Sequence, residues 1–152
     1  MNADEIQNIL ITANLIATMG VTCWLQYKSK REDQKRFLDN QLAKLQELSF
    51  EYPFLEDEKF TKEWNNMKKS YNSKSCENKC DFLRYDVYTE MLFNFIAQSF
   101  IHFKTEEKLM QYIDFKTWVR MHATCWQNPL SDHSNRDTYG DKFCDMIDRW
   151  IK

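Results

Sequence analysis

Glycine and proline are scarce in this chain, with two residues of each among 152. So few glycines exclude sites that depend on glycine-rich turns, such as phosphate-binding loops and nucleophile elbows, and the HExxH motif of zinc proteases is absent as well. Few helix breakers, together with 15% aromatic residues, argue against disorder and against folds rich in β-turns. The composition therefore predicts an all-α protein with long helices around a well-filled core.

The excess of positive charge that is typical of nucleic-acid-binding proteins is also missing. The formal net charge is −2, and residues 37–152 hold 16 basic and 19 acidic residues. Only residues 28–36 are strongly basic, with five basic and two acidic residues. Because a mildly acidic domain does not attract a phosphate backbone, direct binding of nucleic acid is not expected.

Charged residues are also absent from the twenty residues between Ile6 and Leu25, these two included. As a helix with a rise of about 1.5 Å per residue, this stretch spans roughly 30 Å, the thickness of the hydrocarbon layer of a bilayer. Trp24 and Tyr27 lie where an aromatic belt is found in membrane proteins. Residues 6–27 are therefore predicted to form one transmembrane helix, with a buried helix of a soluble protein as the alternative.

The charges on the two sides of this helix predict its direction. Asp4 and Glu5 precede the helix, and the basic residues of 28–36 follow it. A cleaved signal peptide would carry its basic residues before the apolar run instead. The positive-inside rule places residues 1–5 outside and the rest of the chain after the helix in the cytoplasm. We therefore expect a single-pass membrane protein with an extracytoplasmic N-terminus and a cytoplasmic C-terminal domain.

Four polar residues share one face of the predicted transmembrane helix. At about 100° per residue, Gln7, Asn14, Thr18 and Thr22 fall within about 80° of one another. An amide in hydrocarbon needs a hydrogen-bonding partner, so these residues are predicted to line a pore or to contact other copies of the chain in a homo-oligomer. The alternative is a tolerated asparagine beside threonines that bond to their own backbone.

The sequence after the apolar stretch predicts further helices. No glycine or proline occurs between Gly20 and Pro53, so residues 28–49 are expected to continue the transmembrane helix as a membrane-proximal helix that packs against the domain. Residues 50–152 are then expected to form a small cytoplasmic helical domain, in which residues 77–103 form the central helix. The other helices are predicted at about 56–70, 105–126 and 141–151, with N-caps at Thr105 and Asp141 and a kink near Asp114.

The cysteines and histidines carry little sign of a metal site or of catalysis. The five cysteines are Cys23, Cys76, Cys80, Cys125 and Cys144. Since nothing else suggests export, the four in the domain are expected to be reduced thiols rather than two disulfides. Cys76 and Cys80 could share a zinc ion, but no second pair of ligands has matching spacing. His122 is expected to be a core or boundary histidine, and no metal or cofactor is expected.

Several segments together resemble small bacterial membrane-tethered helical proteins of phage defence. These are the apolar helix followed by the basic residues of 28–36, LSFEYPFLEDEKF at 48–60, MLFNFIAQSFIHF at 91–103, and the ending from TWVRMHATCWQNP at 117–129 to DTYGDKFCDMIDRWI at 137–151. Within that group the chain is most similar to the transmembrane accessory proteins of type VI-B CRISPR systems, which accompany an RNA-guided RNA-cutting effector.

This resemblance implies a divergent domain of the helical HEPN type, assembled as a ring of subunits that forms a membrane pore. It also implies that the pore enhances antiphage defence in functional coupling with the RNA-cutting effector. HEPN ribonucleases carry Arg, a polar residue, four to six spacers and His, whereas this chain has Phe93, Asn94, seven spacers and His102. Because the arginine is absent, Asn94 and His102 are expected to be a degenerate HEPN-like pair and the protein not to be an enzyme. The alternatives are a passive membrane-tethered module that recruits a partner and a membrane-bound HEPN ribonuclease.

Overall fold

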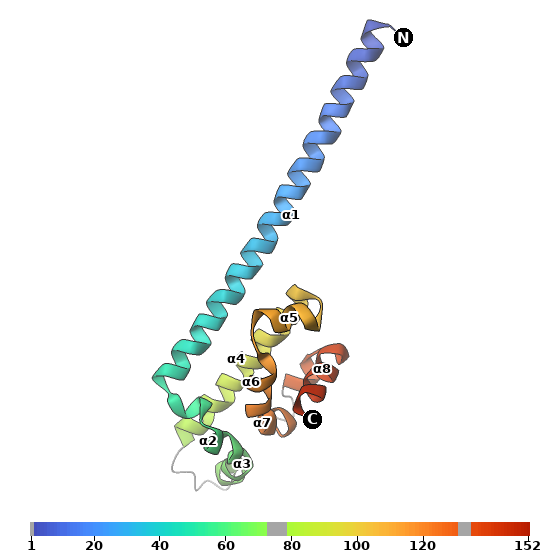
Figure 1. Cartoon of the computed structure of the whole chain (residues 1–152). Helices are drawn as coiled ribbons and strands as arrows, with labels where there is room; N and C mark the ends of the chain where they lie inside the picture. The colour runs from blue at the N-terminus through green and yellow to red at the C-terminus, as the bar shows by residue number, and fades with distance from the viewer. Residues whose placement is uncertain (1, 73–78, 131–134) are drawn as a thin grey trace. The chain divides into compact units, whose positions relative to one another are not determined.

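The computed structural model describes residues 2–72, 79–130 and 135–152. Within these ranges the chain forms eight α-helices and two 3₁₀ helices and no strand, so the prediction of an all-α fold is confirmed (Figure 1). The chain divides into two compact units, Met1–Phe37 and Leu38–Lys152. From Ala3 to Phe37 the first unit is one helix, which continues into the second unit, and the second unit is a helical bundle.

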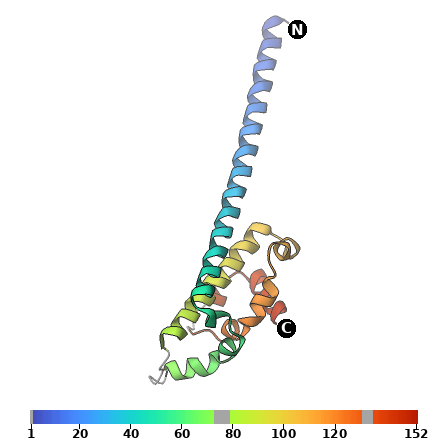
Figure 2. The same cartoon turned by 60° about the vertical axis from the view of Figure 1, so that its left-hand side comes forward.

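The first helix, α1, extends without a break from Ala3 to Glu51 (Figures 1 and 2). No proline interrupts these 49 residues, and Gly20 is their one glycine. Proline disfavours helical geometry in the residue before it, and accordingly Tyr52 lies outside α1 and the 3₁₀ helix η1 follows at Pro53–Glu56. The prediction of one continuous helix through about residue 49 is confirmed, and α1 extends two residues further.

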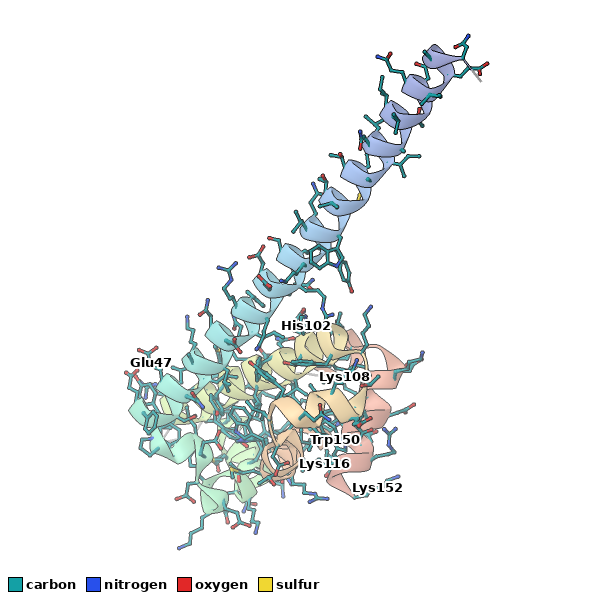
Figure 3. All side chains as sticks on the ribbon, turned by 45° about the horizontal axis from the view of Figure 1, so that its top comes forward. Glu47, His102, Lys108, Lys116, Trp150 and Lys152 are labelled. Atoms are coloured by element: carbon teal, nitrogen blue, oxygen red, sulfur yellow. The ribbon has the colours of Figure 1, made fainter. Side chains whose placement is uncertain are left out.

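The part of α1 in the first unit has no neighbours within that unit. Every described side chain from Asn2 to Phe37 is exposed, and Figure 3 shows these side chains pointing outward all round the helix. This part of α1 is long and apolar enough to cross a membrane, and none of its apolar window is buried. The first unit by itself therefore leaves this stretch uncovered.

The last part of α1 belongs to the bundle. Leu38 and Leu45 are 2% and 1% exposed, and both join the hydrophobic core. The prediction that the membrane-proximal helix packs against the domain is confirmed from Leu38 onward, whereas residues 28–37 belong to the first unit. The core is centred on α4, Lys79–Phe103, which contributes more buried apolar side chains than any other helix.

The predicted helix at 56–70 is wrong as a single element. The chain forms α2 at Glu58–Lys62 and α3 at Trp64–Asn72, with a break at Glu63. The reason is the packing of Trp64, which is fully buried and stacks on Phe82 with ring centroids 4.6 Å apart. Its indole Nε1 also donates to the carbonyl oxygen of Asn128 at 2.7 Å, a bond that fixes the direction of α3.

The predicted helix at 105–126 is divided into three helices, α5 at Glu106–Tyr112, α6 at Phe115–Met121 and α7 at Ala123–Gln127. The predicted N-cap is confirmed, because Oγ1 of Thr105 accepts from the backbone N–H of Lys108. The expected kink near Asp114 is a complete break. The Asp114 carboxylate accepts from the backbone N–H of Thr117 at 3.3 Å and caps a new helix there.

The C-terminal helix α8 extends from Asp141 to Ile151 and follows the short 3₁₀ helix η2 at Asn135–Thr138. Its N-cap is Gly140, so the prediction that Asp141 caps this helix is wrong by one residue. Helix α8 packs against α6. At this contact the Lys116 amine lies 6.0 Å from the ring centroid of Trp150 (Figure 3).

Candidate functional site

The four polar residues predicted to share a face of α1 are all exposed. The hydroxyl of Thr18 donates to the backbone carbonyl oxygen of Asn14, and the hydroxyl of Thr22 donates to that of Thr18, each at 2.8 Å. Both threonine hydroxyl protons are therefore satisfied inside the helix. Within the part of the chain that the structure describes, no hydrogen bond is made by the side-chain amides of Gln7 or Asn14. These two amides are the groups on this face that need an external partner in an apolar medium.

The apolar side chains of the same segment are also uncovered. Leu15 and Ile16 are 62% and 65% exposed, and Trp24 and Tyr27 are 60% and 58% exposed. Transferring one such aliphatic side chain out of water is worth about 1.5–3 kcal/mol. A surface of this kind therefore favours burial in lipid or against other protein chains.

Asn94 and His102 do not form one compact site. The exposed Asn94 accepts a hydrogen bond from the Tyr139 hydroxyl at 2.8 Å, which ties α4 to the segment before α8. The half-buried ring of His102 packs edge-on against Phe103, with centroids 4.9 Å apart. Eight residues of helix separate the two by about 12 Å along the axis of α4, which is beyond the reach of their side chains.

The cysteines are dispersed in the bundle. Cys80 is exposed, and Cys125 and Cys144 are buried on α7 and α8. The predicted partner of Cys80, Cys76, lies outside the described residues. In the ranges that the structure covers, no three His, Cys, Asp or Glu side chains gather closely enough to hold a metal ion.

Sequence reasoning missed a partly buried polar cluster around Glu56, the last residue of η1. Its Oε1 accepts from the indole N–H of Trp118 at 2.7 Å and from the hydroxyl of Tyr88, and it lies 3.5 Å from Nε2 of His122. The Tyr88 hydroxyl is also 3.0 Å from Oγ of Ser49 in the last turn of α1. The carboxylate therefore connects the turn after α1 with α4 and with the α6–α7 junction.

These contacts control the ionisation of Glu56. Burial by itself would raise the pKa of this carboxyl group, but the His122 ring and the hydrogen bonds from Tyr88 and Trp118 outweigh it and lower the pKa below 4.5. Burial, followed by the hydrogen bond to Glu56, raises the pKa of the Tyr88 phenol. Glu56 is therefore ionised at neutral pH and Tyr88 is a neutral donor to it.

The cluster pairs a carboxylate with a histidine, as many acid–base catalysts do, but its geometry is that of a tertiary contact that connects parts of the bundle. His122 is fully buried, so no substrate reaches its ring in this conformation, and the prediction of a core histidine is confirmed. Oε1 of Glu56 is already occupied by two donors. Ser49, Glu56, Tyr88, Trp118 and His122 together form what we call the Glu56 cluster.

No protein-family model, curated protein or solved structure matches this chain. The resemblance to membrane accessory proteins of CRISPR systems therefore stays a prediction based on the layout of the sequence.

Proposed function

We propose that this chain is a single-pass inner-membrane protein that self-associates through α1 into a pore or permeability effector and thereby enhances CRISPR-dependent antiphage defence. The observation that supports it best is the uncharged stretch Ile6–Leu25, whose described side chains are all exposed and which the basic residues 28–36 follow directly. In the proposed arrangement the N-terminus lies outside and the bundle is cytoplasmic. The role in defence rests on the resemblance in sequence layout.

The polar face of α1 supports self-association. The amides of Gln7 and Asn14 are exposed, and Asn14 lies near the middle of the uncharged stretch. An amide at that depth is stabilised when it bonds to the same residue on a neighbouring helix, because lipid offers no donor or acceptor. Several copies brought together at Asn14 would also bring Thr18 together, since the two residues are neighbours on one face.

The assembled mass tests the proposal. The full-length protein is purified in mild detergent, and its mass is measured by light scattering with correction for bound detergent. The proposal expects one discrete oligomer whose protein mass is a multiple of 18.5 kDa large enough for a ring. A monomer or a dimer would contradict a pore lined by α1.

Leakage provides the functional measurement. The purified oligomer is reconstituted into liposomes loaded with a self-quenching dye, and release is followed with and without protein. Release that depends on protein supports a permeability effector. Liposomes that contain the correctly inserted oligomer but release no dye would contradict a permeability effector that is open without a further signal.

One observation favours a second function, that of a passive tether which recruits a partner to the membrane. The hydroxyl protons of Thr18 and Thr22 are satisfied by the backbone of α1, so these residues do not require a water-filled lumen. Replacement of residues 6–27 by an unrelated transmembrane helix separates the two functions. A tether keeps its protective effect against phage after this exchange, and a pore loses it.

A further inference from the structure

The first unit carries a second surface that the proposed pore does not use. We call it the basic collar, and it consists of Lys28, Lys30, Arg31, Lys35 and Arg36, all of them exposed. The collar begins three residues after Leu25, the end of the uncharged stretch. Its residues share their part of α1 with two acidic residues, Glu32 and Asp33.

Both acidic residues form ion pairs with the first and last residues of the collar. The Lys28 amine is 3.9 Å from the carboxylate of Glu32, and Arg36 forms an ion pair with Asp33. Lys30, Arg31 and Lys35 have no acidic partner within residues 28–36. The net charge of +3 in this segment, five basic minus two acidic residues, is therefore carried by three side chains that are open to an external anion.

The depth of the collar follows from the aromatic residues beside it. Trp24 and Tyr27 are both exposed, and such amphipathic rings prefer the level of the lipid headgroups. The Lys28 amine lies 5.7 Å from the ring centroid of Trp24, so collar and aromatic residues are in direct contact. From Tyr27, Arg31 is about 6 Å and Lys35 about 12 Å further along the helix axis. Arg31 thus falls in the headgroup layer, and Lys35 falls within about one Debye length of it.

We propose that the basic collar binds the headgroups of anionic phospholipids in the cytoplasmic leaflet, with Lys30, Arg31 and Lys35 as the contacting residues. Ammonium and guanidinium groups donate charge-assisted hydrogen bonds to phosphate oxygens. The cytoplasmic leaflet is the one with a negative surface potential, which adds a long-range attraction. This inference rests on the proposed insertion of α1, and it adds a lipid partner that sets the depth of the helix and surrounds each subunit.

Quenching of Trp24 fluorescence by brominated lipid measures the lipids next to the collar. The full-length protein is reconstituted into mixed phosphatidylcholine and phosphatidylglycerol liposomes, with bromine on the acyl chains of one lipid at a time. A Trp24→Phe variant gives the signal of the four other tryptophans for subtraction. We expect the anionic lipid to be enriched around Trp24 by about fivefold, the factor expected for one basic side chain at an anionic surface.

Two triple variants with the same change in net charge separate the collar from the overall charge of the protein. Lys30→Gln, Arg31→Gln and Lys35→Gln together are expected to abolish the enrichment. The control replaces three exposed lysines of the bundle with glutamine, Lys44, Lys108 and Lys142, and is expected to keep it. Equal lipid composition around the wild-type protein and the collar variant would overturn the proposal, and so would an equal loss in both triple variants.

Alkaline carbonate extraction of the same liposomes tells failure of this inference from failure of the proposed function. Protein that carbonate releases is not inserted, and that result would overturn both. Protein that resists carbonate but shows no preference for the anionic lipid would overturn the collar alone. The expected result is retention in the membrane together with enrichment that falls when the salt concentration is raised to about 0.5 M.

Discussion

The hydroxyl oxygen of Tyr85 lies 3.0 Å from Nδ1 of His122, and both side chains are fully buried. Burial raises the pKa of the Tyr85 phenol far above neutral pH, so this hydroxyl keeps its proton. Tyr85 can then donate to Nδ1 of His122 in the tautomer that carries its proton on Nε2, and this tautomer directs that proton towards Glu56. One tautomer of His122 therefore suits both of its neighbours.

Tyr85→Phe should destabilise the bundle by about 1–3 kcal/mol, because it leaves a buried ring nitrogen without its donor. The free energy of unfolding is measured in urea by tryptophan fluorescence, with the full-length protein in mild detergent. Tyr112→Phe is the control, since the Tyr112 hydroxyl bonds to the exposed carboxylate of Asp39 and should contribute less. Equal effects of the two substitutions would contradict a special role for the buried pair.

Glu56→Gln should lower the free energy of unfolding by about 1–2 kcal/mol, because it removes the charge that accepts from Tyr88 and Trp118. This figure is below the range for a fully buried charged group, since Glu56 keeps some exposure to solvent. Glu58→Gln is the matched control, because Glu58 only pairs with Lys62 on the surface. That control should change the stability by less than about 0.5 kcal/mol.

The contribution of Glu56 should also depend on pH. Its pKa is lowered in the folded protein from the ordinary value of 4.5, so its stabilising effect is present above pH 4.5 and is lost as the pH falls through the folded pKa. The difference in stability between the wild-type protein and Glu56→Gln should therefore shrink in acid. A difference that stays constant from neutral pH to about pH 3 would contradict an ionised carboxylate in the cluster.

Asp86 should affect the stability with the opposite dependence on pH from Glu56. Burial, followed by repulsion from Glu90, raises its pKa from 3.8 to about 6. Because the pKa is raised in the folded protein, the contribution of Asp86 to the free energy of unfolding is fully favourable below pH 3.8. It is lost as the pH rises through 6. Asp86→Asn should therefore stabilise the protein near neutral pH by about 1 kcal/mol, a figure discounted for partial exposure. The same urea titrations at about pH 3.5 should show little gain, and a gain at both pH values would exclude this cause.

Asn14→Leu should abolish leakage from dye-loaded liposomes while the protein remains inserted. The substitution keeps the helix apolar enough to cross a bilayer and removes the amide that the proposed oligomer uses as a contact. Asn8→Leu makes the same chemical change about 120° away around α1 and should leave leakage unchanged. Wild-type leakage in the Asn14 variant would remove this residue from the proposed mechanism.

The cysteines of the bundle should differ in their reaction with a maleimide. Burial raises the pKa of the Cys125 thiol to about 12, and its sulfur lies 3.1 Å from the hydroxyl of Thr89. Cys80 is exposed. In variants that retain only one of these two cysteines, Cys80 should react within minutes and Cys125 only after unfolding in urea. Rapid labelling of Cys125 in the native protein would show that the core around α7 opens readily.

The long first helix was predictable because its causes are local. The absence of breakers before Pro53 keeps α1 continuous, and the hydroxyl of Thr105 begins α5 through a bond to a residue three positions away. The position of the polar face on α1 follows in the same way from helical periodicity. Such features depend on neighbouring residues and can be read from the chain itself.

The breaks at Glu63 and His122 and the Glu56 cluster were not predictable for the opposite reason. The carboxylate of Glu56 accepts from residues 32 and 62 positions away in sequence. Nothing near Glu56 distinguishes it from the other acidic residues of its segment, which stay on the surface. Its role is set by the tertiary packing that brings α4 and α6 to the turn after α1.

This separation also orders events during synthesis. Ser49 and Glu56 are made before Trp118 and His122, and the 62 residues from Asp57 to Trp118 take roughly 3–12 s to add at about 5–20 residues per second. Throughout that interval the apolar half of α1 is complete, while the bundle lacks Trp118, which donates to Glu56, and His122, which contacts it. During synthesis the apolar helix is therefore available to a membrane or to another chain seconds before the bundle can complete its folding.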